Sequence, residues 1–139
     1  MNPGGADWPA RYVDVDLSEQ HVWLMDGGQV VAESDCVSGD PSSGHATPTG
    51  VYAVYAHVSP MTLVGADEDG NGEPDYRSDV TYWMPFASGY GLHDAPWRTV
   101  FGGQAYRSDG SHGCVNLPSD FARDLYAATD DGTVVVVRE

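Results

Sequence analysis

Closely spaced turn residues are the feature that most constrains how this chain can fold. The 139 residues include 17 glycines and 9 prolines, spread along the whole length. This spacing leaves little room for long helices and favours short strands joined by turns. A chain of this length fits one domain, and its 41% of hydrophobic residues can form a core without metal or disulfide staples. We therefore expect a single, mainly β domain.

Several segments alternate apolar and polar residues, which is the period of a half-buried strand. On this pattern and on β-branched composition, strands are predicted over residues 11–17, 21–25, 29–37, 49–58, 80–86, 90–93 and 133–137. Residues 26–28 provide a hairpin turn between the second and third of these strands. One helix is predicted over about 118–129, with Pro118 in its first turn and apolar residues at spacings of 4 and 3.

The charge of the chain excludes several classes of function. There are 21 acidic residues and 6 basic ones, all of them arginine, so the formal net charge is −15. A surface this acidic repels phosphate backbones, which argues against a nucleic-acid partner. The absence of lysine excludes Schiff-base chemistry and a lysine base. We interpret the charge itself as a solubility or salt-adaptation trait.

A cysteine lies within the short turn-like sequence Ser111-His112-Gly113-Cys114. Such a turn is a poor place for core packing, but its backbone N–H groups can face a developing oxyanion. Gly113 permits a close approach because it has no side chain. The pattern is typical of a cysteine nucleophile in acyl transfer.

Two histidines compete for the role of the base that accepts the thiol proton. His112 is two residues from Cys114 in a tight turn, so its ring is expected to point elsewhere. His93 ends a predicted strand, and the following Asp94 offers a backbone carbonyl that could hold one ring nitrogen. We favour His93 as the general base.

The second cysteine, Cys36, lies in a strand-like segment. A disulfide between Cys36 and Cys114 could form in an oxidising compartment, but it would block the nucleophile. We interpret Cys36 as a small buried hydrophobic residue.

The motif from Ser111 to Asn116, downstream of His93 and of the sequence Ala95-Pro96-Trp97, resembles the catalytic signature of the L,D-transpeptidases, the YkuD family. The resemblance extends over about residues 11–138 and includes segments 13–20, 37–39, 47–52, 82–86, 101–103 and 132–136. It implies a YkuD-like β-sandwich of mixed sheets with one packed α-helix. Residues 1–10 would then be a linker remnant and residues 11–139 the catalytic domain, with a lid at about 57–86.

The resemblance also implies roles for individual residues. Cys114 matches the family's nucleophile and His93 its general base, with Asp94 where a backbone carbonyl orients that base. Ser111, His112 and Gly113 match the loop that shapes the oxyanion hole. The implied substrate-binding residues are Tyr76, Trp97, Asn116 and Met61, of which Trp97 and Met61 could equally serve packing.

The implied activity is a two-step acyl transfer on peptidoglycan stem peptides. The cysteine would release D-alanine from a tetrapeptide stem, and an amine of a second stem would resolve the thioester into a 3→3 cross-link. With water as acceptor, the same site would be an L,D-carboxypeptidase. The resemblance further implies inhibition by carbapenems, no required cofactor, a monomer, and a place outside the bacterial cytoplasmic membrane, either secreted or membrane-anchored.

An acidic loop over residues 67–75 raises the question of calcium. Asp67, Asp69, Asn71 and Asp75 occupy positions 1, 3, 5 and 9 of an EF-hand-like loop. The usual glutamate at position 12 is replaced by Ser78, and Pro74 favours an irregular loop. The segment is therefore either a solvated acidic turn in the lid or a Ca²⁺ site.

Two other readings stay open. A zinc hydrolase could use His93, His112 and Asp94 as ligands, although no His-Glu-x-x-His or paired Cys-x-x-Cys spacing is present. A non-catalytic, calcium-stabilised wall-binding module would have no need for both Cys114 and His93.

Overall fold

The computed structural model describes residues 11–39, 47–64, 77–87, 90–97, 101–102 and 114–139, which form mixed sheets and the helix α2 (Ser119–Ala128). A five-stranded sheet has the order β3 (Gln29–Asp35), β2 (His21–Asp26), β1 (Arg11–Asp16), β10 (Val134–Arg138) and β4 (Gly50–Ala53). A three-stranded sheet joins β7 (Trp83–Ala87), β8 (Tyr90–Asp94) and β9 (Val115–Leu117), and a two-stranded sheet joins β5 (Met61–Val64) and β6 (Arg77–Val80). The β1–β10 and β8–β9 pairs are parallel and the other pairs antiparallel. The expected mainly β class with mixed sheets and a packed helix is confirmed.

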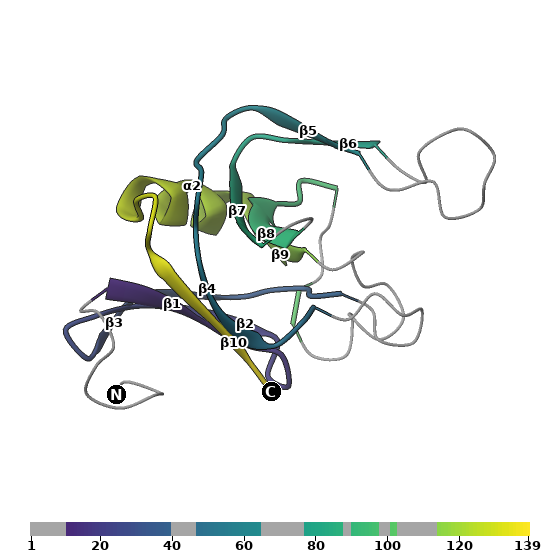
Figure 1. The fold of residues 1–139 in the computed structure, drawn as a ribbon. Helices are drawn as coiled ribbons and strands as arrows, with labels where there is room; N and C mark the ends of the chain where they lie inside the picture. Colours follow the sequence, from purple (N-terminus) through teal and green to yellow (C-terminus); the bar gives the residue numbers. More distant parts are fainter. Residues whose placement is uncertain (1–10, 40–46, 65–76, 88–89, 98–100, 103–113) are drawn as a thin grey trace.

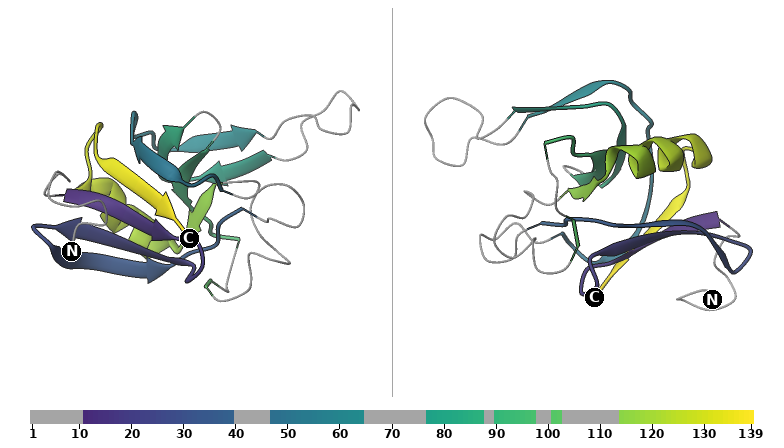
Figure 2. Two further views of the ribbon diagram at one scale, coloured as in Figure 1. Left: turned by 60° about the horizontal axis from the view of Figure 1, so that its bottom comes forward. Right: turned by 180° about the vertical axis from the view of Figure 1, so that it is seen from behind.

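The core lies between two layers. The five-stranded sheet forms one layer, and the three-stranded sheet together with α2 forms the other (Figure 1), as the view from behind also shows (Figure 2). Apolar side chains from both layers meet there, among them Val13, Val15, Val22, Leu24, Met84, Leu92, Val115, Leu117, Phe121, Leu125, Val135 and Val137. Burial of this apolar surface is the main force that holds β8 and β9 over the sheet.

Strand β1 keeps its predicted alternation, but its second face is covered as well. Asp14 and Asp16 are each less than a tenth exposed. Arg138 covers them: its Nε donates to Asp14 at 2.8 Å and its Nη1 to Asp16 at 3.1 Å. The guanidinium also lies 5.8 Å from the centre of the Trp23 ring. Side chains on neighbouring strands therefore bury a polar face that the sequence pattern assigns to solvent.

Two of the strands predicted from the sequence have the wrong boundaries. The segment predicted over 49–58 pairs in the five-stranded sheet only over β4. Beyond it the chain changes partners, since the Tyr55 N–H donates to the Pro85 carbonyl and Val58 forms a bridge with Trp83. The segment predicted over 80–86 is divided between β6 and β7.

The β5–β6 hairpin projects from the layered body (Figure 1). It belongs to the segment 57–86 that was expected to form a lid, and its action as a lid stays a prediction. Strand β7 of the same segment belongs to the core layer, where Met84 and Phe86 are buried. The helix begins one residue after Pro118 and buries Phe121 and Leu125, as predicted. Within the described ranges, no helix is long and apolar enough to cross a membrane.

Cys36 and Cys114 form no disulfide with each other, and Cys36 is fully buried in the main core. Burial raises the pKa of the Cys36 thiol far above its usual range, and the nearby carboxylates of Asp35 and Asp16 raise it further. The folded protein therefore keeps this proton to a higher pH than the unfolded chain does. The stability that follows is complete below the unfolded pKa of about 8.5 and is lost as the pH rises above it.

Replacing Cys36 with alanine is therefore expected to flatten the alkaline loss of stability. At pH 7 the variant should lose about 1 kcal/mol through the small cavity. Above pH 9 the fall in its free energy of unfolding should be shallower by up to about 1.4 kcal/mol per pH unit. Denaturant titrations of reduced protein from pH 7 to 11 would measure this. Tyr12 and Cys114 titrate in both proteins, so their contributions cancel when the two are compared. Parallel plots of the free energy of unfolding against pH would therefore contradict the prediction.

Candidate active site

The parallel pairing of β8 with β9 brings the two predicted catalytic segments together. His93 is paired with Asn116, and Leu92 with Val115. Cys114 comes directly before β9, two residues from Asn116, which is the period at which strand side chains return to the same face. The register thus places Cys114 beside Gly91 on the strand that carries His93. Two segments about twenty residues apart meet because a parallel sheet aligns them.

The Cys114 side chain is buried, with 7% of the residue exposed. Burial raises the pKa of its thiol to about 11, and a hydrogen bond from the Gly91 backbone acts in the opposite direction. At neutral pH the resting group is therefore a thiol, and it becomes a nucleophile only when a base removes its proton. This differs from a preformed thiolate–imidazolium pair, because desolvation disfavours the anion.

The His93 imidazole is held in one orientation. Its Nδ1 lies 2.6 Å from the backbone carbonyl oxygen of Asp94, which can only accept, so Nδ1 carries the proton. In the neutral ring Nε2 is then an acceptor, the form that a general base requires. The rings of Trp83 and Trp97 lie 5.9 and 6.0 Å from the imidazole, and His93 is only 3% exposed.

The Asp94 carboxylate has a separate function that the sequence did not indicate. It accepts hydrogen bonds from the backbone N–H groups of Thr81 at 2.9 Å and Tyr82 at 2.8 Å, and it is fully buried. These two residues form the break between β6 and β7, so the carboxylate replaces the ladder partners they would have in a continuous strand. A carboxylate occupied by two N–H donors is a poor zinc ligand, which argues against the zinc hydrolase alternative.

The other predicted site residues are placed as follows. Trp97 is half exposed next to His93, and Met61 is exposed on β5. Asn116 is buried, and its backbone forms a bridge with Val37, with N–H to oxygen distances of 2.8 and 3.0 Å. Tyr76, Ser111, His112, Gly113 and the calcium candidates Asp67, Asp69, Asn71 and Asp75 lie outside the described residues. Among the residues that are described, no group of three or more His, Cys, Asp or Glu side chains could hold a metal ion.

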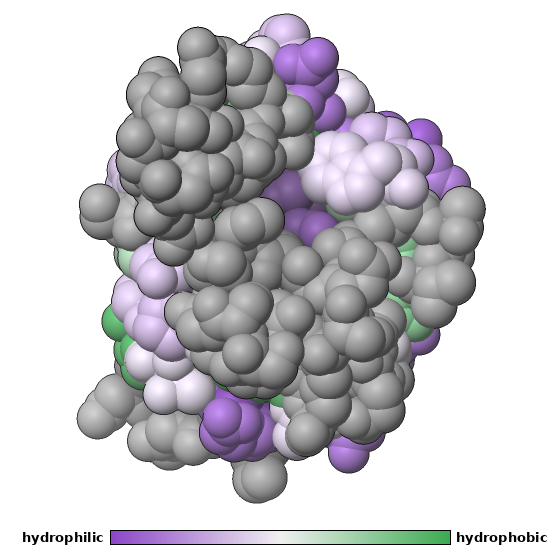
Figure 3. Space-filling view, turned by 90° about the vertical axis from the view of Figure 1, so that its right-hand side faces the viewer, coloured by the Kyte–Doolittle hydropathy of each residue, from purple (hydrophilic) through white to green (hydrophobic). Residues whose placement is uncertain are grey.

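The β5–β6 hairpin extends to the right of Figure 1, and Figure 3 shows the molecule from that side. The centre of this face is hollowed, with hydrophilic side chains at the bottom of the hollow (Figure 3).

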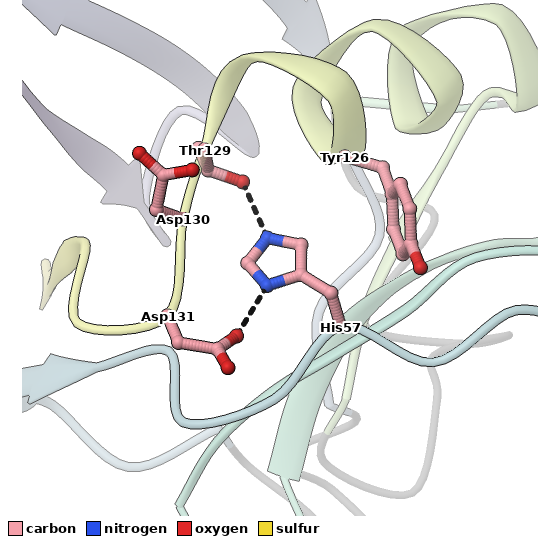
Figure 4. Close-up of a pocket in the computed structure, with 5 residues that line it drawn as sticks. All are labelled: His57, Tyr126, Thr129, Asp130 and Asp131. Carbon is pink, nitrogen blue, oxygen red and sulfur yellow. Dashed lines mark hydrogen bonds and ion pairs between the residues drawn. The ribbon is translucent and has the colours of Figure 1, made fainter.

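A second histidine makes contacts with the spacing of a catalytic triad. His57 Nδ1 lies 2.7 Å from the Asp131 carboxylate and Nε2 lies 2.9 Å from the Thr129 hydroxyl (Figure 4). These residues line a pocket of about 530 Å³ with Tyr126 and Asp130. However, the Thr129 hydroxyl donates its proton to the Leu125 carbonyl at 2.8 Å and is buried at the end of α2. Its proton is directed to that carbonyl and not to His57, so Thr129 is not an activated nucleophile, and the group joins the segment after β4 to the α2–β10 turn.

Comparison with known proteins identifies the family to which the chain belongs. A sequence model of the L,D-transpeptidase catalytic domain, YkuD, matches residues 10–137. A solved structure of a mutant L,D-transpeptidase from Enterococcus faecium is 39% identical, with a TM-score of 0.84 over 94% of this chain and 50% of that chain. The catalytic domain from E. faecium L,D-transpeptidase, acylated by ertapenem, is 39% identical, with a TM-score of 0.82 over 95% of this chain and 99% of that one.

A more distant structure is L,D-transpeptidase 3 from Mycobacterium tuberculosis with a faropenem-derived adduct. It is 26% identical, with a TM-score of 0.74 over 94% of this chain and 61% of that chain. No curated protein sequence matches the chain. The chain spans about half the length of the mutant E. faecium L,D-transpeptidase structure. It belongs to the L,D-transpeptidase catalytic domain family.

Proposed function

We propose that this protein is a peptidoglycan L,D-transpeptidase that uses Cys114 as its nucleophile. The observation that carries the proposal is the pairing of β8 with β9, which joins a buried thiol to a strand whose histidine has a fixed tautomer. The homologous E. faecium domain forms an acyl-enzyme with ertapenem, which supports acyl transfer at the equivalent site.

The reaction follows from these groups in two steps. His93 Nε2 takes the proton of Cys114 Sγ as the sulfur attacks the carbonyl carbon that joins the third stem residue to D-alanine. The tetrahedral intermediate collapses, His93 returns the proton to the D-alanine nitrogen, and a thioester on Cys114 remains. An amine of a second stem then attacks the thioester, His93 accepts the amine proton, and the thiol is regenerated with a 3→3 cross-link.

The other predicted site residues have proposed roles in the same reaction. Backbone N–H groups of His112, Gly113 and Cys114 are proposed to bind the oxyanion, and Tyr76, Met61, Trp97 and Asn116 to contact the donor stem.

The substrate lies outside the cytoplasmic membrane, so we propose that the protein acts in the bacterial cell envelope. Finding the full-length protein only in the cytosol would count against that location.

Intact-protein mass spectrometry with a disaccharide tetrapeptide tests the proposal. We expect an added mass on Cys114 equal to the substrate minus D-alanine, with stoichiometric release of D-alanine. With excess substrate bearing a free side-chain amine, a 3→3 dimer should accumulate. Release of D-alanine without any dimer would indicate the L,D-carboxypeptidase instead, with water as acceptor. The absence of both adduct and D-alanine release would overturn the assignment.

A further inference from the structure

A backbone N–H group faces the nucleophile from the neighbouring strand. The register of β8 and β9 places Gly91 beside Cys114, and the Gly91 backbone is hydrogen-bonded to the Cys114 sulfur. An N–H donor stabilises a thiolate more than a thiol, because a hydrogen bond to a charged partner is the stronger one. The strength of this contact depends on how accurately the backbone at Gly91 is held.

The Trp83 side chain packs against that backbone. A Cβ atom added at Gly91 would lie 2.6 Å from two atoms of the Trp83 indole, far closer than real contacts allow. The indole therefore occupies the place of a side chain at Gly91. It is also directly opposite His93 in the β7–β8 register, with 5.9 Å between ring centres. The same residue thus packs against the strand on which both Gly91 and His93 lie.

The Trp83 backbone is hydrogen-bonded on the edge of β7 that does not pair with β8. Its backbone N–H donates to the Val58 carbonyl and its carbonyl accepts from the Val58 N–H, both at 2.9 Å. The two neighbouring N–H groups, at Thr81 and Tyr82, are bound by the Asp94 carboxylate. The Trp83 backbone and the two residues before it are therefore anchored, which fixes the strand from which the indole packs on Gly91.

We propose that Trp83 is a positioning residue for the nucleophile: its indole holds the Gly91 backbone so that the Gly91 N–H donates to Cys114 Sγ and stabilises the thiolate formed during attack. The catalytic part of this inference rests on the proposed transpeptidase function, whereas the effect on the thiol does not. Glycine is required at position 91 because a Cβ atom there would overlap the indole and would lie 2.9 Å from the Pro85 Cα.

Substitution of Trp83 tests the proposal through the pH dependence of thiol alkylation. In a Cys36→Ala background Cys114 is the only thiol, and its iodoacetamide rate can be followed from pH 7 to 11. Trp83→Leu is expected to move the profile to higher pH and to slow alkylation at pH 7 by about tenfold or more, since a donor to a charged group is weakened. Trp83→Phe keeps an aromatic ring over Gly91 and should restore part of the rate.

Trp23→Leu is the matched control. Trp23 is also a partly buried indole, but it packs in the second apolar cluster with Tyr12 and Met25. Its loss should lower the thermal midpoint without moving the alkylation profile. An unchanged profile in Trp83→Leu, with a lowered thermal midpoint alone, would show that Trp83 is merely structural and would overturn the proposal.

An amide-to-ester replacement at residue 91, made by semisynthesis, removes the N–H and keeps Trp83. We expect the alkylation profile of this ester protein to move to higher pH in the same way, and an unchanged profile would also overturn the proposal. This second test decides the question even if Trp83→Leu does not fold. Alkylation needs no substrate, so the outcomes remain separable. If the variants shift the alkylation profile but the parent protein never releases D-alanine, the transpeptidase function is refuted and the positioning role of Trp83 stands. If the parent protein releases D-alanine but the variants leave the profile unchanged, the positioning role is refuted and the transpeptidase function stands.

Discussion

Replacing Cys114 with alanine is expected to abolish both carbapenem acylation and D-alanine release while the fold is retained. In the proposed mechanism the Cys114 thiol forms the covalent bond to the substrate, and alanine has no nucleophilic group at that position. Intact-protein mass spectrometry after incubation with ertapenem, together with a D-alanine assay, would measure the loss. The homologous E. faecium domain is acylated by ertapenem, which makes this compound a suitable probe.

Cys36→Ala is the matched control for this experiment. It removes the other thiol of the chain, which is buried in the core, and should leave a single ertapenem adduct in place. An adduct that persists in Cys114→Ala and disappears in Cys36→Ala would show that the nucleophile has been assigned to the wrong cysteine. Equal circular dichroism spectra of the three proteins would establish that the fold is common to them.

Replacing His93 with alanine is expected to lower the acylation rate at pH 7 by 10²-fold or more, the usual size of a general-base contribution. Burial keeps the pKa of the Cys114 thiol at about 11, so without the imidazole little thiolate exists at neutral pH. The rate of the variant should then rise about tenfold per pH unit toward that pKa, whereas the parent protein should be far less dependent on pH. Stopped-flow acylation by a carbapenem from pH 6 to 10 would compare them.

His93→Gln and His112→Ala complete this test. Glutamine can keep a hydrogen bond to the Asp94 carbonyl but cannot accept the thiol proton, so its rate should match that of the alanine variant. His112→Ala should be less damaging than His93→Ala, because only the side chain and not the backbone N–H is lost. If His112→Ala were the slower of the two, His112 would have to be the base.

Cys114 and His93 could be proposed as a catalytic pair from the sequence because both lie in short motifs whose chemistry is local. Cys114 follows a glycine in a Ser/His/Gly segment, and the carbonyl that holds His93 belongs to the next residue, Asp94. A histidine and a carbonyl one residue apart are bound to be neighbours, so this contact needs little tertiary information. The alternation in β1 and the spacing of apolar residues in α2 were readable for the same reason.

The contacts that surround this pair were not predictable, since they join residues that are distant in the chain. The Asp94 carboxylate divides the strand predicted over 80–86 by binding the N–H groups of Thr81 and Tyr82. Likewise the strand predicted over 49–58 ends early because Tyr55 finds its partner at Pro85 in the other layer. Propensity and periodicity cannot report such partners, because a tertiary hydrogen bond overrides local preference.

The sequence by itself determined that the chain is mainly β and that it has a helix after Pro118, and it predicted Cys114 and His93 as the residues that carry the chemistry. Those properties depend on local propensity, hydrophobic period and the reactivity of particular side chains. Only the tertiary structure decided how reactive the thiol is and what aligns it. Burial sets the pKa of Cys114, the β8–β9 register brings it to Gly91, and the Trp83 indole occupies the space over that glycine. Desolvation and strand pairing are properties of the assembled layers, so they arise only when the two layers close over a common core.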